Sequence, residues 1–470
     1  MDGPGRPDVL AALLARQRAA FLLAPRVGVE LRRDSLRRLE SLIDTHAARF
    51  AAAIDADFGG RSRHETALAE THLLLGAARH ARRRVARWMR PQRVPTALLQ
   101  WPGRSRIVLQ PLGVVGIIGA WNYPLLLTLG PLVGVLAAGN RALVKPAEGA
   151  PRTAEALAAA IAATFDVEEV ATVTGDAQLG AAFAALPFDH LVFTGSTAVG
   201  RLVAAAAAPN LTPLTLELGG KSPAIVDASA DLERAAERIA WGKLLNAGQT
   251  CIAPDYVLVA REHCEDFATL LANAMCRLYP GAARNPDYTS IVSARHRERL
   301  LALADEARAA GARVVEVMPG EATSRRLGPM LVLDAPDSAR LMREEIFGPV
   351  LPIVPVESLD AAIGYVNARP RPLALYWFGR DAAAQARILG ETFAGGVTIN
   401  DTLLHITQDA LPFGGIGPSG CGHYHGEHGF RRFSATKAVF EQSRLGATRL
   451  VYPPYRAWLE GVMAMLRRLS

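Results

Sequence analysis

The residue that most clearly offers chemistry is Cys251, which lies in the stretch NAGQTCIAPDY at residues 246–256. The other cysteines of the chain are Cys264, Cys276 and Cys421. Their spacing matches no zinc or dithiol pattern, so neither a disulfide framework nor a metal knuckle is indicated. A catalytic thiol needs substrate access, small neighbours and a reason to ionise, and GQTC supplies the small neighbours. Cys251 is therefore a candidate nucleophile, although a lone cysteine is also often a small, buried, hydrophobic residue.

Two polar side chains could act together with such a thiol. Glu217 ends the apolar strand pattern LTLE and begins ELGGKSP, where partial burial raises the pKa of a carboxyl group toward that of a general base. Asn122 lies in AWNYP, within a glycine-rich apolar region, where its amide could donate to a ligand oxygen. The alternatives are a strand-end carboxylate capped by the glycine amides and an ordinary turn asparagine. Each residue alone leaves the choice open.

Two further segments could hold a phosphate or a ribose. FTGSTAVG places Gly195 and Ser196 between a strand and a helix, where backbone N–H groups can bind an anion. LVKPAE ends a strand at Lys145 and places Glu148 three residues later. Lysine can bond ribose or phosphate oxygens, and a carboxylate can hold a ribose diol. An ordinary strand–helix turn and a surface ion pair are the open alternatives.

Other chemistry-bearing patterns fit less well. CGHYHGEH, residues 421–428, lacks a second ligand cluster at zinc-finger spacing, so no metal site is predicted. The chain has no G-x-S-x-G elbow and no G-x-x-x-x-G-K-[ST] loop, which disfavours a serine hydrolase of that type and a P-loop enzyme. The basic run Arg79–Arg93 could contact a nucleic acid. No aromatic stacking pattern accompanies it, so a solvated helix face is favoured.

The elements that must position these residues alternate along the chain. Residues 8–98 are predicted to be mostly helical, because apolar residues recur at spacings of three and four. Residues 107–140 carry no charge, but glycines and prolines interrupt the run, which favours a buried strand, a loop and a buried helix over a membrane span. From residue 142 onward, and again from residue 256, short strands alternate with helices. This alternation predicts parallel βαβ units.

The composition is typical of a large globular protein. The chain has 470 residues, of which 50% are apolar and 21% are charged, enough for two or three domains with a sizeable core. The formal net charge is +7, carried mostly by arginine. Four cysteines and no visible secretory signal predict a cytoplasmic protein. An arginine-rich mitochondrial transit segment at the start is the alternative.

The motifs are weak singly, but their order along the chain is informative. WNYP, KPAE, FTGSTAVG, ELGGKSP, GQTC, EEIFGP and PFGGIGPSG begin at residues 121, 145, 193, 217, 248, 344 and 412. With these motifs in this order, the chain resembles the aldehyde dehydrogenase family from about residue 10 to residue 440. GQTCIAPDY, the tyrosine of WNYP and GHYHGEHGF resemble the fatty- and aromatic-aldehyde branch. Ala120, where many relatives have proline, and Cys421, where methionine is common, depart from the pattern without removing a catalytic group.

The resemblance implies oxidation of an aldehyde to a carboxylic acid with NAD, or alternatively NADP, through a hemithioacetal and a thioester on Cys251. Glu217 would be the general base and Asn122 a donor to the oxyanion, and no metal is implied. Asn400 would lie on the substrate side. The implied cofactor contacts are Lys145, Glu148, Gly195, Ser196, Glu345 and Phe347.

The resemblance also implies an architecture of two parallel-sheet α/β domains plus a small oligomerisation β element. The NAD(P)-binding domain is expected over residues 1–98 and 112–219, and the catalytic domain over residues 220–424. The oligomerisation element is expected over residues 99–111 and about 425–440, and a C-terminal tail over residues 441–470. A homodimer is expected, without a nucleic acid partner or an integral membrane segment.

Several functional questions stay open at this stage. A CoA-acylating dehydrogenase, in which CoA attacks the thioester, is one alternative, and a catalytically silent protein on the same fold is another. Glu148 should repel the 2′-phosphate of NADP and favour NAD. The resemblance implies an aromatic substrate or a medium-to-long aliphatic aldehyde, without choosing between them.

Overall fold

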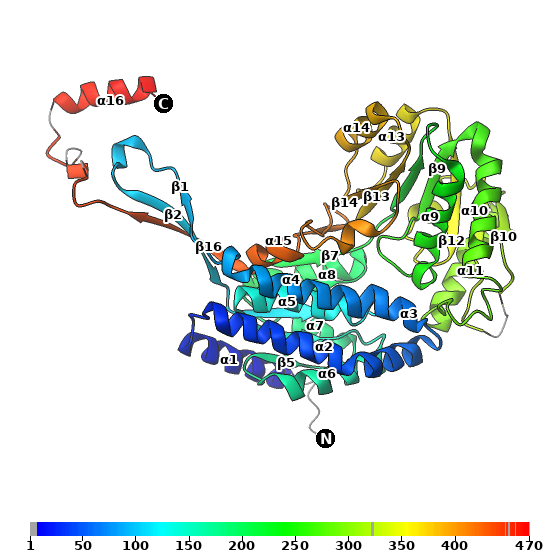
Figure 1. Ribbon diagram of the computed structural model, residues 1–470, viewed down its shortest axis with the longest axis horizontal. Helices are drawn as coiled ribbons and strands as arrows, with labels where there is room; N and C mark the ends of the chain where they lie inside the picture. Colours follow the sequence, from blue (N-terminus) through cyan, green and yellow to red (C-terminus); the bar gives the residue numbers. More distant parts are fainter. Residues whose placement is uncertain (1–6, 321–323, 447, 450–451, 456, 470) are drawn as a thin grey trace.

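The computed structural model describes residues 7–320, 324–446, 448–449, 452–455 and 457–469. It contains three sheets, which form a body, a lobe and a projecting arm (Figure 1). Residues 1–6 of the expected nucleotide domain, residues 321–323 of the expected catalytic domain, and residues 447, 450–451, 456 and 470 of the expected tail lie outside the described part.

A six-stranded sheet forms the centre of the body. Its strand order is β15-β7-β6-β3-β4-β5, and all neighbours are parallel except β15 and β7. The strands are β3 (Val114–Ile118), β4 (Arg141–Lys145), β5 (Val170–Thr172), β6 (His190–Thr194), β7 (Leu214–Glu217) and β15 (Gly420–Cys421). The central strands β3 and β6 are buried along their whole length. Strands covered on both faces need continuous apolar sequence, which explains the uncharged run at 107–140.

A seven-stranded sheet forms the centre of the lobe, in the order β10-β11-β12-β9-β8-β13-β14. Only β10 runs antiparallel to its neighbour. The strands are β8 (Pro223–Val226), β9 (Tyr256–Ala260), β10 (Arg313–Glu316), β11 (Met330–Leu333), β12 (Val350–Val356), β13 (Ala374–Phe378) and β14 (Gly396–Ile399). The thiol stretch at 246–256 therefore lies immediately before the strand β9.

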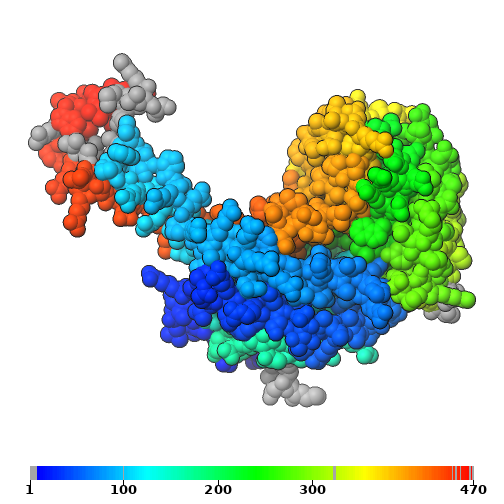
Figure 2. All heavy atoms as spheres, viewed as in Figure 1, coloured from blue at the N-terminus to red at the C-terminus, as the bar shows by residue number. Residues whose placement is uncertain are grey.

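The arm is a three-stranded antiparallel sheet that projects away from the body (Figure 1). Its strands are β1 (Gln92–Val94), β2 (Arg104–Pro111) and β16 (Ser434–Glu441), with β2 in the centre. Figure 2 shows an open, concave face between the arm and the lobe.

Helices cover both faces of the two larger sheets. In the body these are α1 (Pro7–Leu23), α2 (Val29–Phe58), α3 (Arg63–Thr66), α4 (Leu73–Trp88), α5 (Leu126–Ala138), α6 (Pro151–Thr164), α7 (Ala177–Ala184), α8 (Thr197–Ala207) and α15 (Gly426–Arg432). In the lobe they are α9 (Leu232–Leu244), α10 (Cys264–Leu278), α11 (Ala294–Ala309), α12 (Arg340–Arg343), α13 (Leu359–Asn367) and α14 (Ala382–Glu391), and the tail contains α16 (Trp458–Leu469).

The apolar core has three parts. One cluster joins α2, α4 and α5 in the body to α9, α10 and α11 in the lobe, so the body and the lobe share a core. A second cluster packs α1, α7 and α8 against the opposite face of the body sheet. A third packs α13 and α14 against the outer face of the lobe sheet. The continuous first cluster gives side chains from both sheets a rigid common frame.

The structure confirms the expected fold class of two largely parallel α/β units and a small antiparallel element. Residues 107–140 form most of β2, all of β3 and the buried helix α5, as the glycine and proline pattern predicted. In the described part of the chain, no helix is both long and apolar enough to cross a bilayer.

Candidate active site

Cys251 follows a left-handed turn at the end of α9. Asn246, Ala247 and Gly248 all have positive φ, at 54°, 51° and 75°. Two successive non-glycine residues in this region need surrounding contacts to hold them. At Gly248 only glycine fits, since a Cβ there would lie 2.4 Å from the carbonyl oxygen of Gly348. The turn thus constrains the backbone immediately before the thiol.

Gln249, two residues before the thiol, anchors this turn from the buried side. Its Nε2 donates to the carbonyls of Asn246 and Ser290, each at 3.0 Å, and its Oε1 accepts from the N–H of Val292 at 2.9 Å. The side chain is fully buried, and its hydrogen-bonding capacity is used within the protein. This accounts for the glutamine of GQTC as a positioning residue.

Asn122 lies against the thiol loop. Its Nδ2 donates to the carbonyl of Gln249 at 3.1 Å, and its own carbonyl accepts from Asn246 Nδ2 at 3.0 Å. The neighbouring Tyr123 forms a 2.8 Å hydrogen bond between its hydroxyl and Thr250 Oγ1. An asparagine amide carries two N–H groups, so one remains besides the bond to Gln249. These contacts bring the AWNYP loop within two residues of the thiol.

A buried ion pair, which sequence reasoning missed, supports the loop that carries Asn122. The side chains of Arg61 and Glu70 are fully buried, with Nη1 and Oε1 3.0 Å apart. Arg61 Nη1 also donates to the carbonyl of Asn122 at 3.0 Å. Glu70 Oε2 accepts from the N–H groups of Leu125 and Leu126, at 2.7 and 3.0 Å, where α5 begins. The available signal was a set of charged residues, RSRHETALAE, inside an otherwise amphipathic helical region.

We expect Glu70→Gln to lower the free energy of unfolding by about 3–5 kcal/mol, because it removes the carboxylate that is paired with the buried Arg61 guanidinium. Glu427→Gln is the matched control, since it removes an exposed i,i+4 pair with Arg431 and should change stability by less than about 1 kcal/mol. Urea unfolding followed by tryptophan fluorescence measures both. Equal, small losses in the two variants would show that the buried pair is not a structural support.

Glu217 ends β7 with a buried carboxylate. Its side chain is 2% exposed, and neither carboxyl oxygen has a hydrogen-bond partner in the described part of the chain. The alternative that glycine amides cap this carboxylate is therefore wrong. Burial raises the pKa of Glu217 well above its ordinary value. Such a group can take up a proton near neutral pH, which suits a general base.

The half-buried Cys251 thiol lies in the field of two carboxylates. Burial raises the pKa of the thiol, and the negative charges of Glu345 and Glu217 raise it further. Ionisation needs a proton acceptor or a positive charge nearby.

Glu345, from the lobe, lies beside the ELGG segment that begins at Glu217. A Cβ on Gly219 would lie 2.2 Å from Glu345 Oε2, so the first glycine of ELGG leaves room for this carboxyl group. Burial, followed by the charge of Asp255, raises the pKa of Glu345 to about 8. Phe347 has a φ of 54°, and its ring meets the edge of Trp121 at a centroid distance of 5.4 Å. The EEIFGP segment therefore adjoins both ELGG and WNYP.

Lys145 and Glu148 lie at the carboxyl end of β4. Lys145 is buried, Glu148 is half exposed, and Nζ donates to Oε2 at 2.7 Å. Partial burial opposes ionisation of Glu148, but the hydrogen bond and charge of Lys145 outweigh it and lower the pKa of the carboxyl group. An ionised carboxylate that is fixed by a lysine, and still reachable from solvent, can accept bonds from a ribose diol.

Gly195 and Ser196 lie where β6 ends and α8 begins. The Gly195 N–H donates to the carbonyl of Glu217 at 3.0 Å, which ties this turn to β7. Ser196 is the N-cap of α8, and its Oγ accepts weakly from the N–H of Val199 at 3.4 Å. The first turn of the 11-residue helix α8 offers further N–H groups to an anion.

A pocket opens between α4, α5 and the segment 406–426. Tyr424, which is buried, belongs to its lining, together with Leu126 of the AWNYP side and Asp409. The charges of Glu217 and Cys251 both act on the Tyr424 phenol, and burial raises its pKa. Leu126 in the lining lies four residues after Asn122, so the pocket adjoins the AWNYP segment.

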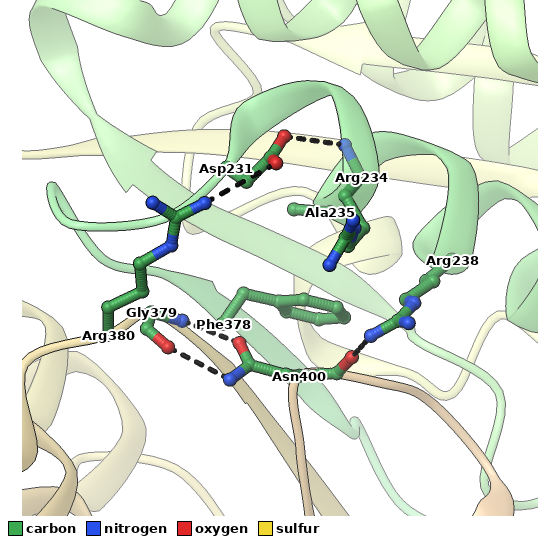
Figure 3. A pocket seen from close by; sticks show the side chains of 8 residues that line it. All are labelled: Asp231, Arg234, Ala235, Arg238, Phe378, Gly379, Arg380 and Asn400. Carbon is green, nitrogen blue, oxygen red and sulfur yellow. Dashed lines mark hydrogen bonds and ion pairs between the residues drawn. The ribbon is translucent and has the colours of Figure 1, made fainter.

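Asn400 does not point into that pocket. It ends β14 with a φ of 56°, and its amide accepts from the Gly379 N–H at 2.8 Å and donates to the Gly379 carbonyl at 2.9 Å. Figure 3 shows it in a separate, shallow pocket, with Arg238 bonded to its backbone carbonyl. The side chain of Asn400 therefore joins the ends of β13 and β14.

The histidine-rich stretch at 421–428 is dispersed. Cys421 donates from Sγ toward the Leu214 carbonyl at 3.7 Å, and His425 stacks on Phe413 at a centroid distance of 5.0 Å. Within the described residues, no three His, Cys, Asp or Glu side chains form a group that could hold a metal ion.

Comparison with known proteins decides the family. The sequence profile of the aldehyde dehydrogenase family matches residues 5–439. The chain belongs to the aldehyde dehydrogenase family. As a member with thiol, carboxylate and amide gathered at one place, it is an NAD(P)-dependent aldehyde dehydrogenase, and the resemblance seen in the motif order is confirmed.

Several curated relatives of this aldehyde dehydrogenase match it over almost their whole length. A probable coniferyl aldehyde dehydrogenase of Pseudomonas aeruginosa is 51% identical, over 95% of this chain and 94% of that protein. A coniferyl aldehyde dehydrogenase of a Pseudomonas species is 44% identical, over 98% and 97%. A 4,4′-diaponeurosporen-aldehyde dehydrogenase of Staphylococcus aureus is 38% identical, over 93% and 95%.

Solved structures support the same assignment. Substrate-bound AldH of Staphylococcus aureus superposes with a TM-score of 0.92 at 36% identity, over 97% of this chain and 99% of that chain. An NAD⁺ complex of an aldehyde dehydrogenase from Bacillus cereus superposes with a TM-score of 0.84 at 27% identity, over 93% and 90%.

Proposed function

We propose that Cys251, Glu217 and Asn122 carry out the aldehyde oxidation. The observation that carries this proposal is their convergence: Asn122 bonds the residue two positions before the thiol. The segment 345–348 also adjoins both Gly219, two residues after Glu217, and Gly248, three residues before the thiol. Cys251 gives up its Sγ proton to water, and the thiolate adds to the aldehyde carbon. The oxyanion that forms is held by the remaining N–H of Asn122 and the Cys251 backbone N–H, where one such donor is worth about 2.7–4 kcal/mol.

The second half of the reaction releases the acid. Loss of hydride from the hemithioacetal leaves a thioester on Cys251, and Glu217 takes a proton from the water that attacks it. The thiolate leaves, and the carboxylic acid is released. The chemistry that NAD(P) supplies when bound is acceptance of the hydride. The unpartnered, buried Glu217 carboxylate favours water over CoA as the attacking group, so hydrolysis is preferred to CoA acylation.

The residues present fit a dinucleotide. We assign the adenosine ribose to Lys145 and Glu148, the pyrophosphate to Gly195 and Ser196, and the nicotinamide end to Glu345 and Phe347. The supporting observations are the fixed, ionised carboxylate of Glu148, the open first turn of α8, and the Glu345 oxygen that lacks a hydrogen-bond partner among the described residues. Glu148 disfavours the 2′-phosphate of NADP, so NAD is the preferred cofactor.

We propose a coniferyl-type aldehyde, an aromatic ring conjugated to the aldehyde, as the substrate. Relatives named coniferyl aldehyde dehydrogenase at 44–51% identity support it. The pocket beside Tyr424 supports it too, since Gly76 and Gly130 carry no side chain into it and leave room for a ring.

We expect NADH formation to be fastest with coniferyl and cinnamyl aldehydes when kcat/KM is compared across aromatic and straight-chain aldehydes. The kcat/KM for aldehydes with a conjugated ring should exceed that for hexanal by roughly tenfold or more. Burial of the ring in an apolar pocket contributes about several tenths to a few kcal/mol of transition-state binding. Fluorescence of NADH measures this directly. A preference for straight-chain aldehydes would contradict the substrate class while leaving the oxidation itself established.

We further propose that the protein is a homodimer whose subunits contact each other through the arm. We also propose that it is cytoplasmic. The strand β16 pairs only with β2, which leaves one edge of the arm unpaired, and an unpaired edge can bond another chain. Phe440 at 48% exposure and Trp101 at 66% add apolar surface there. We also propose the domain division that the sequence predicts, with the cofactor on the body and the catalytic thiol on the lobe.

A further inference from the structure

The pocket beside Tyr424 has a flat, apolar inner part. Gly130 of α5 lies against the Tyr424 ring, where a Cβ would be 3.5 Å from Cε2. Gly76 of α4 leaves similar space on the facing wall. The missing side chains therefore create room for a planar group between α4 and α5.

One wall of the pocket, at Tyr424, is connected through the chain to the strand of Glu217. Gly420 pairs with Glu217 across β15 and β7, which holds the following residues up to Tyr424 beside the candidate base. The Tyr424 hydroxyl is buried and has no hydrogen-bond partner within the described residues. The pocket also borders Leu126, four residues after Asn122, which brings it beside the segment of the candidate oxyanion donor.

The ionisable side chains that line the pocket include one acidic residue, Asp409, besides His72 and His425. Asp409 follows the short helical segment 404–407, and its Oδ2 lies 4.0 Å from the position of a Cβ on Gly76. Its carboxylate is one-third exposed, with Oδ2 3.9 Å from His80 Nδ1. A distance of 3.9 Å is too long for a hydrogen bond, so this oxygen is left with capacity to accept one.

We propose that Asp409 is a specificity-determining residue that accepts a hydrogen bond from the ring hydroxyl of a phenolic aldehyde. The inference rests on the proposed oxidation and deepens it, because it names the substituent that the enzyme recognises. An ionised carboxylate only accepts hydrogen bonds, so it favours a hydroxyl donor over an unsubstituted ring or an ether. Hydrogen bonds that involve a charged group are among the stronger ones.

The test compares two substrates that differ only in this hydroxyl: 4-hydroxycinnamaldehyde and cinnamaldehyde. For the unaltered enzyme, kcat/KM should favour the hydroxylated substrate. In Asp409→Asn the ratio of the two kcat/KM values should fall roughly tenfold, since a bond to a charged group is replaced by one to a neutral amide. Glu357→Gln, which alters an exposed carboxylate paired with Arg261, is the matched control and should keep the ratio.

A second variant tests the same pocket independently, in case Asp409→Asn does not fold. Gly130→Ala adds a methyl group at ordinary contact distance, 3.5 Å from the Tyr424 ring, and favours the helix. It should lower kcat/KM for both cinnamaldehydes severalfold relative to hexanal. Gly364→Ala in α13, where a Cβ would meet nothing within 4 Å, is its control.

Each outcome has a definite meaning. An unchanged substrate ratio in a folded Asp409→Asn, or an equal loss for both substrates, overturns the role of Asp409. If the ratio of kcat/KM for the cinnamaldehydes to kcat/KM for hexanal is unchanged in Gly130→Ala, the placement of the ring is overturned. If the unaltered enzyme oxidises neither cinnamaldehyde but does oxidise hexanal, the proposed substrate class fails, and if it oxidises none of the three, the proposed function fails.

Discussion

Cys251→Ala should abolish NADH formation with every aldehyde, with kcat lowered by roughly 10⁴-fold or more, because it removes the sulfur that forms the hemithioacetal and the thioester. The variant should still fold and still bind NAD, since the loop before the thiol is held by Gln249 and the turn at 246–248 rather than by the sulfur. Steady-state NADH fluorescence gives the rate, and quenching of tryptophan fluorescence by NAD gives the binding.

Cys421→Ala is the matched control for the loss of a thiol. Cys421 is exposed, and its sulfur makes only one long contact, at 3.7 Å to the Leu214 carbonyl. Its replacement should leave kcat within about twofold of the unaltered enzyme. Residual turnover by Cys251→Ala, or an equal loss in Cys421→Ala, would show that the chemistry does not pass through a thioester on Cys251.

The parts of this site that the sequence predicted are those carried by short motifs at the ends of strands. Cys251, Glu217 and Lys145 each follow or end a strand or helix whose periodicity is visible, and parallel strands deliver their carboxyl ends to one edge of a sheet. The fold class followed from the same alternation of strands and helices. These features are local, so a single sequence is enough to see them.

What the sequence could not predict depends on contacts between distant segments. Arg61 and Glu70 come from a region that looks like an ordinary amphipathic helix, yet their pairing lies under the loop of Asn122, about 50–60 residues away in the chain. Asn400 looked like a substrate-side residue, whereas its amide is used in joining two strand ends. Tyr424 lies in the histidine-rich stretch 421–428, whose residue types suggest metal binding and not a substrate pocket.

The variant Glu217→Gln should separate formation of the thioester from its hydrolysis. Removing the base leaves attack on the aldehyde and loss of hydride intact, but it slows the attack of water on the thioester. We expect a burst of NADH close to one equivalent per active site, followed by a steady-state rate lowered by about 10²–10⁴-fold. Rapid-mixing fluorescence resolves the two phases.

The pH dependence separates the two titrating groups. Water is activated only by the ionised form of Glu217, and burial raises the pKa of this carboxyl group well above its ordinary value. The steady-state rate of the unaltered enzyme should therefore rise with pH in a range above that of an exposed carboxylate, whose pKa is about 4.3. In Glu217→Gln this rise should be absent from the steady-state phase, while the burst phase keeps the pH dependence of the Cys251 thiol.

A nucleophile that needs no base provides a second test of Glu217 as the general base. Hydroxylamine attacks a thioester without help, so it should restore turnover in Glu217→Gln more strongly than in the unaltered enzyme. Glu345→Gln removes the other carboxylate that acts on the thiol, and we expect its main effect on the KM for NAD, without a burst. If Glu217→Gln shows no burst, the slow step precedes the thioester, and Glu217 acts on the thiol instead. If CoA accelerates the unaltered enzyme, the thioester is discharged by CoA, and the hydrolytic role of Glu217 is wrong.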